Sequence, residues 1–167
     1  MSELPTFVLD RSFDAPPDLV WRAWTDPELL PQWYGPGVDS IVHKLDVQPG
    51  GVWLHEMRWG GNSNFQRADF TAVEPGARLV ALQSTTDADW NVIDNPMTEN
   101  WPRVLTLSVT FAANGDRTDM RLTWTPHDAT DAEIASFEAA LGGLGQGWGS
   151  GMDLLEKLLA ELKANAG

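Results

Sequence analysis

The chain has 167 residues, of which 43% are hydrophobic and nine are tryptophan, so it can bury one sizeable core and is predicted to be a single domain over residues 1–167. Its net charge of −13 argues against binding to nucleic-acid phosphates and against docking on anionic membranes. It contains no cysteine, which excludes disulfides, thiolate catalysis and cysteine metal sites.

The N-terminal part of the chain is predicted to form one strand followed by two short helices. Residues 5–14 alternate well enough for a strand. Pro16 and Pro17 then suit the first turn of a helix. A second helix is expected to open at Thr25, because Thr25 and Glu28 have the spacing of a capping box.

The middle of the chain is predicted to form antiparallel hairpins, because short apolar runs are bounded by Gly, Pro or Asn. The expected strands are 38–47, 52–59, 65–73, 78–84, 103–111 and 117–124. Asn114-Gly115 is a strong hairpin signal between the last two. The long polar stretch 85–102 also carries apolar residues, namely Trp90, Ile93, Met97 and Trp101. Long loops in compact domains tend to be functional, so this loop is the natural lid of a site.

The last part of the chain is predicted to be one long helix that continues through six glycines between residues 142 and 151. Thr130 and Glu133 form a capping box at its start. From Ile134 to Leu162 the apolar residues recur in steps of three or four, which is helical phase. Each interior glycine costs roughly 0.8–1 kcal/mol of helix stability relative to alanine, so another structural feature should offset this cost. Either the helix approaches the sheet closely, or it bends and opens a space between helix and sheet.

Three stretches of the sequence resemble one superfamily. They are FDAPPDLVWRAWTDPELLPQWYGP at 13–36, DVQPGGVW at 46–53 and QGWGSGMDLLEKLL at 146–159. They look like the START-like (SRPBCC) superfamily, and within it they resemble the branch related to the C-terminal domain of the activator of the heat-shock-protein-90 ATPase. The resemblance covers about residues 7–163.

This resemblance implies an α+β helix-grip fold. A curved antiparallel sheet of about six or seven strands would wrap around the long C-terminal helix, with two short helices after the first strand. The resemblance also implies a deep apolar cavity between helix and sheet. Members of the superfamily include lipid and small-molecule carriers, cyclases and dehydratases, and co-chaperone domains, so the motifs narrow the fold more than the chemistry.

The strand at 52–59 has one parity made of Trp53, His55, Met57 and Trp59, which could line the cavity with His55 as its polar handle. The alternative is ordinary core with one hydrogen-bonded histidine. Glu56 and Arg58 have the opposite parity and are expected to face solvent or a partner.

Five separate segments contribute Trp33, Trp90, Trp101, Trp124 and Trp148. Several of these are expected to converge near the helix and the long loop on an aromatic-walled pocket, although they could equally fill the core. With Met152 of the last helix, the predicted ligand-binding set is Trp33, Trp53, His55, Met57, Trp90, Trp101, Trp124, Trp148 and Met152.

No catalytic pair is apparent. The possible bases are His43, His55, His127, Asp69 and Glu56, and no two of them have a diagnostic spacing, so His55 remains the one candidate catalytic residue. Neither H-x-x-x-H nor H-E-x-x-H occurs, so no metal site is expected, and no cofactor is implied.

The leading hypothesis is non-catalytic binding of a small hydrophobic or aromatic molecule between helix and sheet. One alternative is an enzyme of cyclase, dehydratase or hydrolase type that uses a pocket histidine or acid. Another is a protein-interaction module of the co-chaperone kind with a chaperone partner. A homodimer is expected. Without a leader at Met1 or an apolar run of about 18 residues, a cytoplasmic protein that does not insert in membranes is expected.

Overall fold

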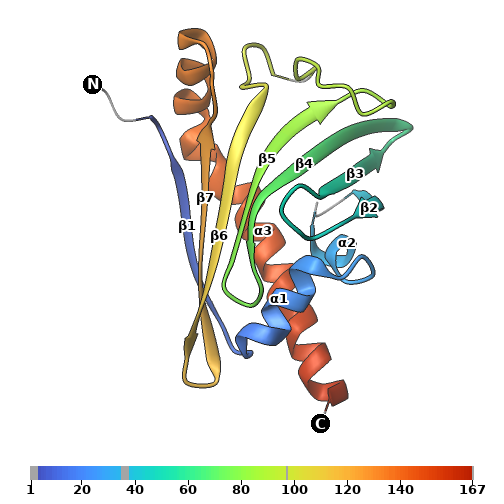
Figure 1. Cartoon of the computed structure of the whole chain (residues 1–167), viewed down its shortest axis with the longest axis vertical. Helices are drawn as coiled ribbons and strands as arrows, with labels where there is room; N and C mark the ends of the chain where they lie inside the picture. The colour runs from blue at the N-terminus through green and yellow to red at the C-terminus, as the bar shows by residue number, and fades with distance from the viewer. Residues whose placement is uncertain (1–3, 35–37, 97, 167) are drawn as a thin grey trace.

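The computed structural model describes residues 4–34, 38–96 and 98–166. The elements follow the chain in an order of one strand, two helices, six strands and a long helix (Figure 1). Their bounds are β1 Phe7–Phe13, α1 Pro17–Thr25, α2 Leu30–Trp33, β2 Asp39–Leu45, β3 Val52–Trp59, β4 Asn62–Glu74, β5 Arg78–Thr86, β6 Val104–Asn114, β7 Arg117–Pro126 and α3 Asp131–Ala166. Met97, one of the apolar residues noted in the predicted lid, lies outside the described residues.

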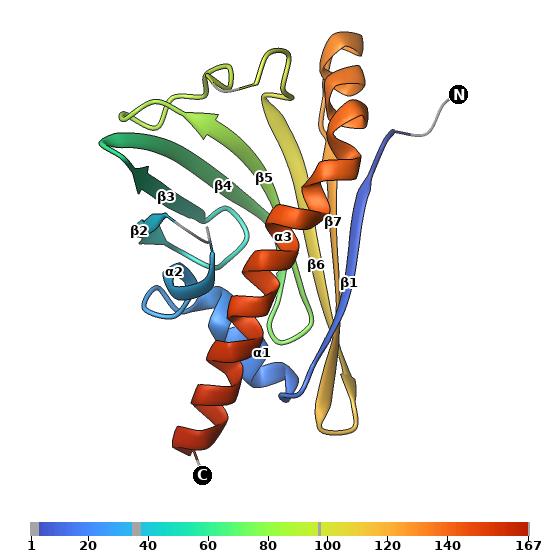
Figure 2. The same ribbon diagram turned by 180° about the vertical axis from the view of Figure 1, so that it is seen from behind.

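The strands form one antiparallel sheet of seven strands in the order β1-β7-β6-β5-β4-β3-β2. The sheet curves, and α3 runs along its inner face with α1 and α2 beside its C-terminal half (Figures 1 and 2). This arrangement confirms the predicted α+β helix-grip fold.

Alternation decides which side chains the sheet turns toward α3. On β6, Leu105, Leu107 and Val109 are buried, and their neighbours on the other parity are more exposed. One row across the sheet joins Trp53, Ala68, Gln83 and Leu105, which are successive partners on β3, β4, β5 and β6. Gln83 is therefore a polar residue in an otherwise apolar row.

The long helix forms as predicted. It is continuous from Asp131 to Ala166, and Thr130 and Glu133 make both hydrogen bonds of the capping box, at 3.1 and 3.0 Å. Its axis changes direction near the middle, as Figures 1 and 2 show from opposite sides. A Cβ added at Gly142, Gly143 or Gly149 would meet nothing within 4 Å. Close approach to the sheet is therefore the wrong explanation for these three glycines.

The prediction that a capping box at Thr25 opens the second helix is wrong. Thr25 is the last residue of α1, and its hydroxyl donates to the carbonyl of Trp21 at 2.8 Å. Asp26 is extended, with φ −96° and ψ 122°, because the residue before a proline avoids the helical region. The carboxylate of Asp26, rather than Thr25, accepts the N–H of Glu28, at 2.8 Å.

The core fills one end of the space between α3 and the sheet. Around Trp24, Trp53 and Phe70 only a void of about 10 Å³ is left. Beside them the C-terminal half of α3 contributes Met152, Leu155 and Leu159, all buried. Within the described part of the chain, no helix is long and apolar enough to cross a membrane.

Candidate functional site

Two adjoining cavities occupy the other end of the space between α3 and the sheet. Their volumes are about 380 and 570 Å³. Both are lined by the same five residues at their junction, Gln66, Gln83, Trp124, Gly143 and Leu144. Gly143 and Leu144 come from the glycine-rich part of α3, so this part of the helix forms a wall of both cavities.

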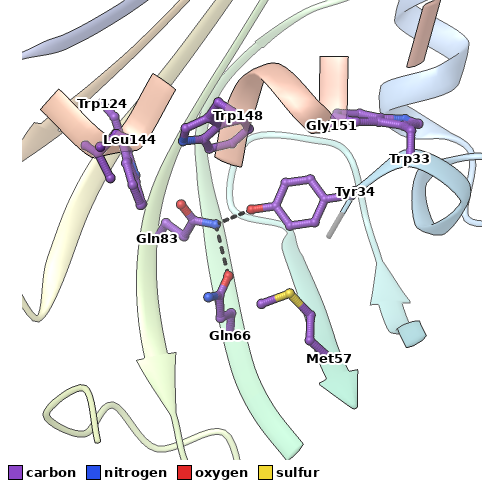
Figure 3. Close-up of a pocket in the computed structure, with 10 residues that line it drawn as sticks. Trp33, Tyr34, Met57, Gln66, Gln83, Trp124, Leu144, Trp148 and Gly151 are labelled. Atoms are coloured by element: carbon purple, nitrogen blue, oxygen red, sulfur yellow. Dashed lines mark hydrogen bonds between the residues drawn. The ribbon is translucent and has the colours of Figure 1, made fainter. Parts of the chain in front are cut away.

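Aromatic rings make most of the wall of the smaller cavity (Figure 3). Trp33 is held by a hydrogen bond from its Nε1 to the carbonyl of Ala23 at 2.9 Å. Trp148 of α3 packs edge-on against Tyr34 and against Trp124, with ring centroids 5.8 Å apart in both pairs. These T-shaped contacts fix the rings in place, because edge-to-face pairs are favourable and directional.

The polar groups of this cavity form one network (Figure 3). Gln83 Nε2 donates to the hydroxyl of Tyr34 at 3.0 Å and to Oε1 of Gln66 at 3.3 Å. Burial raises the pKa of Tyr34 to about 12, with the Gln83 hydrogen bond opposing, so the phenol stays neutral. The network therefore brings hydrogen-bonding groups but no charge to the cavity wall.

The larger cavity extends under the 85–102 loop, whose Asn95, Thr98, Trp101 and Pro102 line it. The loop is fastened to the start of α3 at two points. Glu133 accepts the backbone N–H of Arg103 at 3.0 Å, and Ser136 donates to the carbonyl of Glu99 at 3.1 Å. The loop thus forms part of the wall of this cavity, and its role as a lid remains a prediction.

Five residues of the predicted ligand-binding set line these cavities. Trp33, Met57, Trp124 and Trp148 surround the smaller one. Trp101 and, again, Trp124 border the larger one. The structure brings them together from α2, β3, the loop, β7 and α3; that they bind a ligand remains a prediction.

Four other residues of the set lie elsewhere. Met152 is fully buried in the core, and Trp53 borders the small void at the filled end. Trp90 lies on the opposite face of the sheet, where its ring contacts His43 and Phe65. Its backbone has a positive φ of 67°, which turns the chain at this point. His55, the fourth, is enclosed behind the cavity wall.

His55 is on the inner face of β3 as its parity predicts, but it lines neither cavity. It is 2% exposed, its ring lies 5.0 Å from Tyr34 and 5.1 Å from Trp53, and neither ring nitrogen has a hydrogen-bond partner in the structure. Burial, helped by the nearby His43, lowers the pKa of His55 to about 4. The ring is therefore neutral near pH 7.

The expectation that Glu56 faces solvent is wrong. Its side chain is buried on the outer face of the sheet, where it accepts hydrogen bonds from Arg58 Nε at 2.6 Å, His43 Nε2 at 2.8 Å and Ser63 Oγ at 2.8 Å. The hydrogen bonds from Arg58 and His43 lower the pKa of Glu56 to about 2 against the effect of burial. Arg58 itself is exposed, as expected.

A bulge in β2 explains part of this cluster. The register between β2 and β3 shifts at His43, between Val42 and Lys44. Ile41 therefore pairs with Glu56, whereas Leu45 pairs with Trp53 on the other face. Strict alternation would put Ile41, His43 and Leu45 on one face, and the extra residue breaks that pattern.

The sequence prediction missed the polar network of Tyr34, Gln66 and Gln83. One signal was present, because Gln83 follows Leu79 and Ala81 on a parity that is otherwise apolar. A second was that Tyr34 is the only tyrosine of the chain. Over residues 4–34, 38–96 and 98–166, no three His, Asp or Glu side chains gather as a metal site would need.

Comparison with known families identifies the chain. Residues 14–160 match the family described as Activator of Hsp90 ATPase homolog 1-like protein. The chain belongs to this family. Its members share the helix-grip fold, whose proteins generally bind ligands. A comparison with curated proteins gave no match.

Solved structures of similar fold support the architecture. A protein from Mycobacterium smegmatis is 22% identical, with a TM-score of 0.76 over 95% of this chain and 96% of its own. One from Arthrobacter aurescens is also 22% identical, with a TM-score of 0.77 over 93% and 86%. One from Nitrosomonas europaea is 25% identical, with a TM-score of 0.71 over 98% and 99%. At such identities the likeness concerns the fold.

Proposed function

We propose that this protein binds a small hydrophobic or aromatic molecule, without catalysis, in the cavities between α3 and the sheet. The observation that carries the proposal is the aromatic wall of the 380 Å³ cavity, formed by Trp33, Tyr34, Trp124 and Trp148 around three polar groups. Ligand sites typically have volumes of about 300–1,000 Å³ and are mostly apolar with a few fixed polar groups.

The energetics favour an apolar ligand. Removing apolar surface from water contributes about 25 cal/mol per Å², and indole and phenol rings offer large flat surfaces for it. The rings are held by edge-to-face contacts, so little side-chain freedom has to be lost when a ligand binds.

The enzyme alternative has less support. It expected His55 in a water-accessible cavity beside a second polar group. Instead His55 is 2% exposed, and both ring nitrogens lack a hydrogen-bond partner in the part of the chain that the structure describes. A general base has to come within hydrogen-bonding reach of the proton that it removes, and His55 lines neither cavity.

The co-chaperone alternative expected an exposed apolar patch on the sheet or on the first two helices. In the described residues, the exposed large apolar side chains are Leu4, Val8, Val92 and Leu154. None of them belongs to α1 or α2, and of these four only Val8 lies in a strand of the sheet, whereas a docking surface normally needs a contiguous patch.

The direct test is native mass spectrometry of the purified protein, followed by denaturing extraction of any bound molecule. We expect a hydrophobic molecule at a near-stoichiometric ratio. The same spectrum measures the mass of the assembly and so tests the expected homodimer.

A pair of variants of α3 separates cavity binding from adhesion to the surface. Leu144 lines both cavities, whereas Leu154 is 37% exposed on the same helix. Leu144→Trp should fill the cavity and abolish binding of a probe such as 2-naphthamide in calorimetry, while Leu154→Trp should leave it unchanged. Equal binding by both variants would place the probe outside the cavity and refute the proposal.

A further inference from the structure

Two buried polar atoms of residues shared by the two cavities have no hydrogen-bond partner among the described residues. They are Oε1 of Gln83, an acceptor, and Nε1 of Trp124, a donor. Gln83 is 5% exposed, and both residues line both cavities. Leaving such a group unpaired costs about 1–3 kcal/mol, so native structures usually supply a partner.

The orientation of Gln83 is set by the network. Its amide nitrogen is engaged by the Tyr34 hydroxyl and by Gln66, which leaves the carbonyl oxygen for another partner. In Figure 3 the amide nitrogen points to Tyr34 and Gln66, and the carbonyl oxygen points away from them, toward the side where Trp124 and Trp148 lie. Gln83 and Trp124, which carry this unpaired acceptor and this unpaired donor, are both among the residues that line the two cavities.

The lining carries no charge. Of the described residues that border the two cavities, Tyr34 alone is ionisable, and its raised pKa keeps it neutral. A buried carboxylate or ammonium group needs a partner of opposite charge to offset its lost hydration, and this wall offers none.

We propose that the ligand of this cavity is an uncharged aromatic or hydrophobic molecule whose polar head offers both a hydrogen-bond donor, to Gln83, and an acceptor, to Trp124. A carboxamide has this pair of groups. The inference rests on the proposed function and specifies its ligand class: ionised acids and plain hydrocarbons are disfavoured, the first by desolvation and the second by the two unpaired groups.

The test uses three probes with one ring system, measured by calorimetry on the whole protein at pH 7. They are 2-naphthamide, 2-methylnaphthalene and 2-naphthoate. We expect the amide to bind about 25-fold more tightly than the hydrocarbon, since each of the two hydrogen bonds contributes roughly fivefold, and the carboxylate to bind most weakly.

Three variants, one of them a control, then test which side-chain groups produce the preference for the amide over the hydrocarbon. Gln83→Met and Trp124→Phe should each reduce the amide-to-hydrocarbon preference about fivefold by removing one hydrogen-bonding group. Trp148→Phe is the matched control, because it also replaces an indole by a phenyl ring. Trp148 is a neighbouring ring that has not been assigned a hydrogen bond to the head group. It should change the affinities for the amide and the hydrocarbon alike.

The outcomes separate this inference from the proposed function. If no probe binds, the proposed function fails. If the hydrocarbon or the carboxylate binds at least as tightly as the amide, the cavity binds ligands but the inferred head group is wrong. The probe series on the unmodified protein gives this answer even where a variant does not fold.

Discussion

At the scale of single residues, His55 shows the cost of a polar side chain in an apolar interior. Its ring packs against those of Tyr34 and Trp53, and neither nitrogen has a hydrogen-bond partner within residues 4–34, 38–96 and 98–166. Such a histidine is buried readily only when its ring is neutral, because the charged ring would lose its hydration without gaining a counter-charge. The stability of the protein should therefore depend on pH through this residue.

The unfolded chain takes up a proton on His55 near pH 6.5, whereas the folded protein does so only near pH 4. Lowering the pH between these values therefore favours the unfolded state, and the contribution of His55 to stability is complete only above pH 6.5. We expect the free energy of unfolding to fall by about 3 kcal/mol over this interval because of His55.

Urea unfolding between pH 4 and 7 measures this effect. His55→Phe should have a flatter pH dependence than the unmodified protein over that range. His127→Gln is the control, because that imidazole is 41% exposed, and its profile should follow the unmodified one. Parallel profiles for all three proteins would contradict the assignment.

Glu56 gives a second prediction at this scale. Its folded pKa of about 2 lies below the ordinary value of 4.5, so its contribution to stability is present above pH 4.5 and is lost as the pH falls toward 2. Glu56→Gln should destabilise the protein by about 1–2 kcal/mol at pH 7, because it removes charge-assisted hydrogen bonds to Arg58 and His43.

The control for Glu56 is Glu74→Gln. Glu74 pairs with Arg78 at 3.3 Å, but both side chains are exposed, so the change should cost less than about 0.5 kcal/mol in urea unfolding at pH 7. The deficit of Glu56→Gln should also shrink below pH 4.5. A deficit as small as that of Glu74→Gln would show that the buried cluster does not stabilise the fold.

At the scale of elements, α3 combines poor helix-forming residues with an unbroken helix. Gly142, Gly143 and Gly149 stand where an added Cβ would meet nothing within 4 Å, and Gly143 borders both cavities. Packing of apolar side chains at both ends, such as Phe137 and Leu155, stabilises the helix despite the glycines between them. Local propensity was overridden by tertiary contacts.

Alanine substitutions test this reading. Gly142→Ala and Gly143→Ala should each raise the free energy of unfolding by about 0.8–1 kcal/mol in urea, because alanine suits a helix better and nothing obstructs the added methyl group. Only Gly143→Ala adds a methyl group to the cavity wall, so it alone should alter probe affinity. Destabilisation by Gly142→Ala would instead indicate that the bend requires glycine there.

At the scale of the whole molecule, one end of the space between helix and sheet is filled and the other is open. The filled end leaves a void of about 10 Å³, and the open end holds cavities of about 380 and 570 Å³. Cavities lower stability because their lining loses packing contacts. A ligand that fills the open end should therefore stabilise the folded state.

We expect an excess of 2-naphthamide at about one hundred times its Kd to add roughly 2.7 kcal/mol and raise the Tm by about 5–10 °C. Differential scanning calorimetry measures this shift. Leu144→Trp should show no shift, whereas Leu154→Trp should respond like the unmodified protein. A shift of equal size in Leu144→Trp would mean that the probe stabilises the protein from another site.

Local patterns in the sequence determined the elements and, through the family motifs, the fold. The helical phase from Ile134 to Leu162 and the capping box at Thr130 depend on residues three or four apart, so one stretch of chain is enough to predict them. The prediction failed where a local pattern fits two structures, as at Thr25. There the sequence suggested a capping box that begins a second helix, but Pro27 ends the first helix instead.

The site was decided by the tertiary structure. The network of Tyr34, Gln66 and Gln83 joins residues far apart in the chain, and no spacing in the sequence encodes such a meeting. The placement of Trp90 on the outer face depends on a loop, and the pairing of Glu56 with His43 depends on a bulge. The physical reason is that periodicity predicts which face a residue takes within a regular element, whereas bulges, loops and packing determine which faces meet.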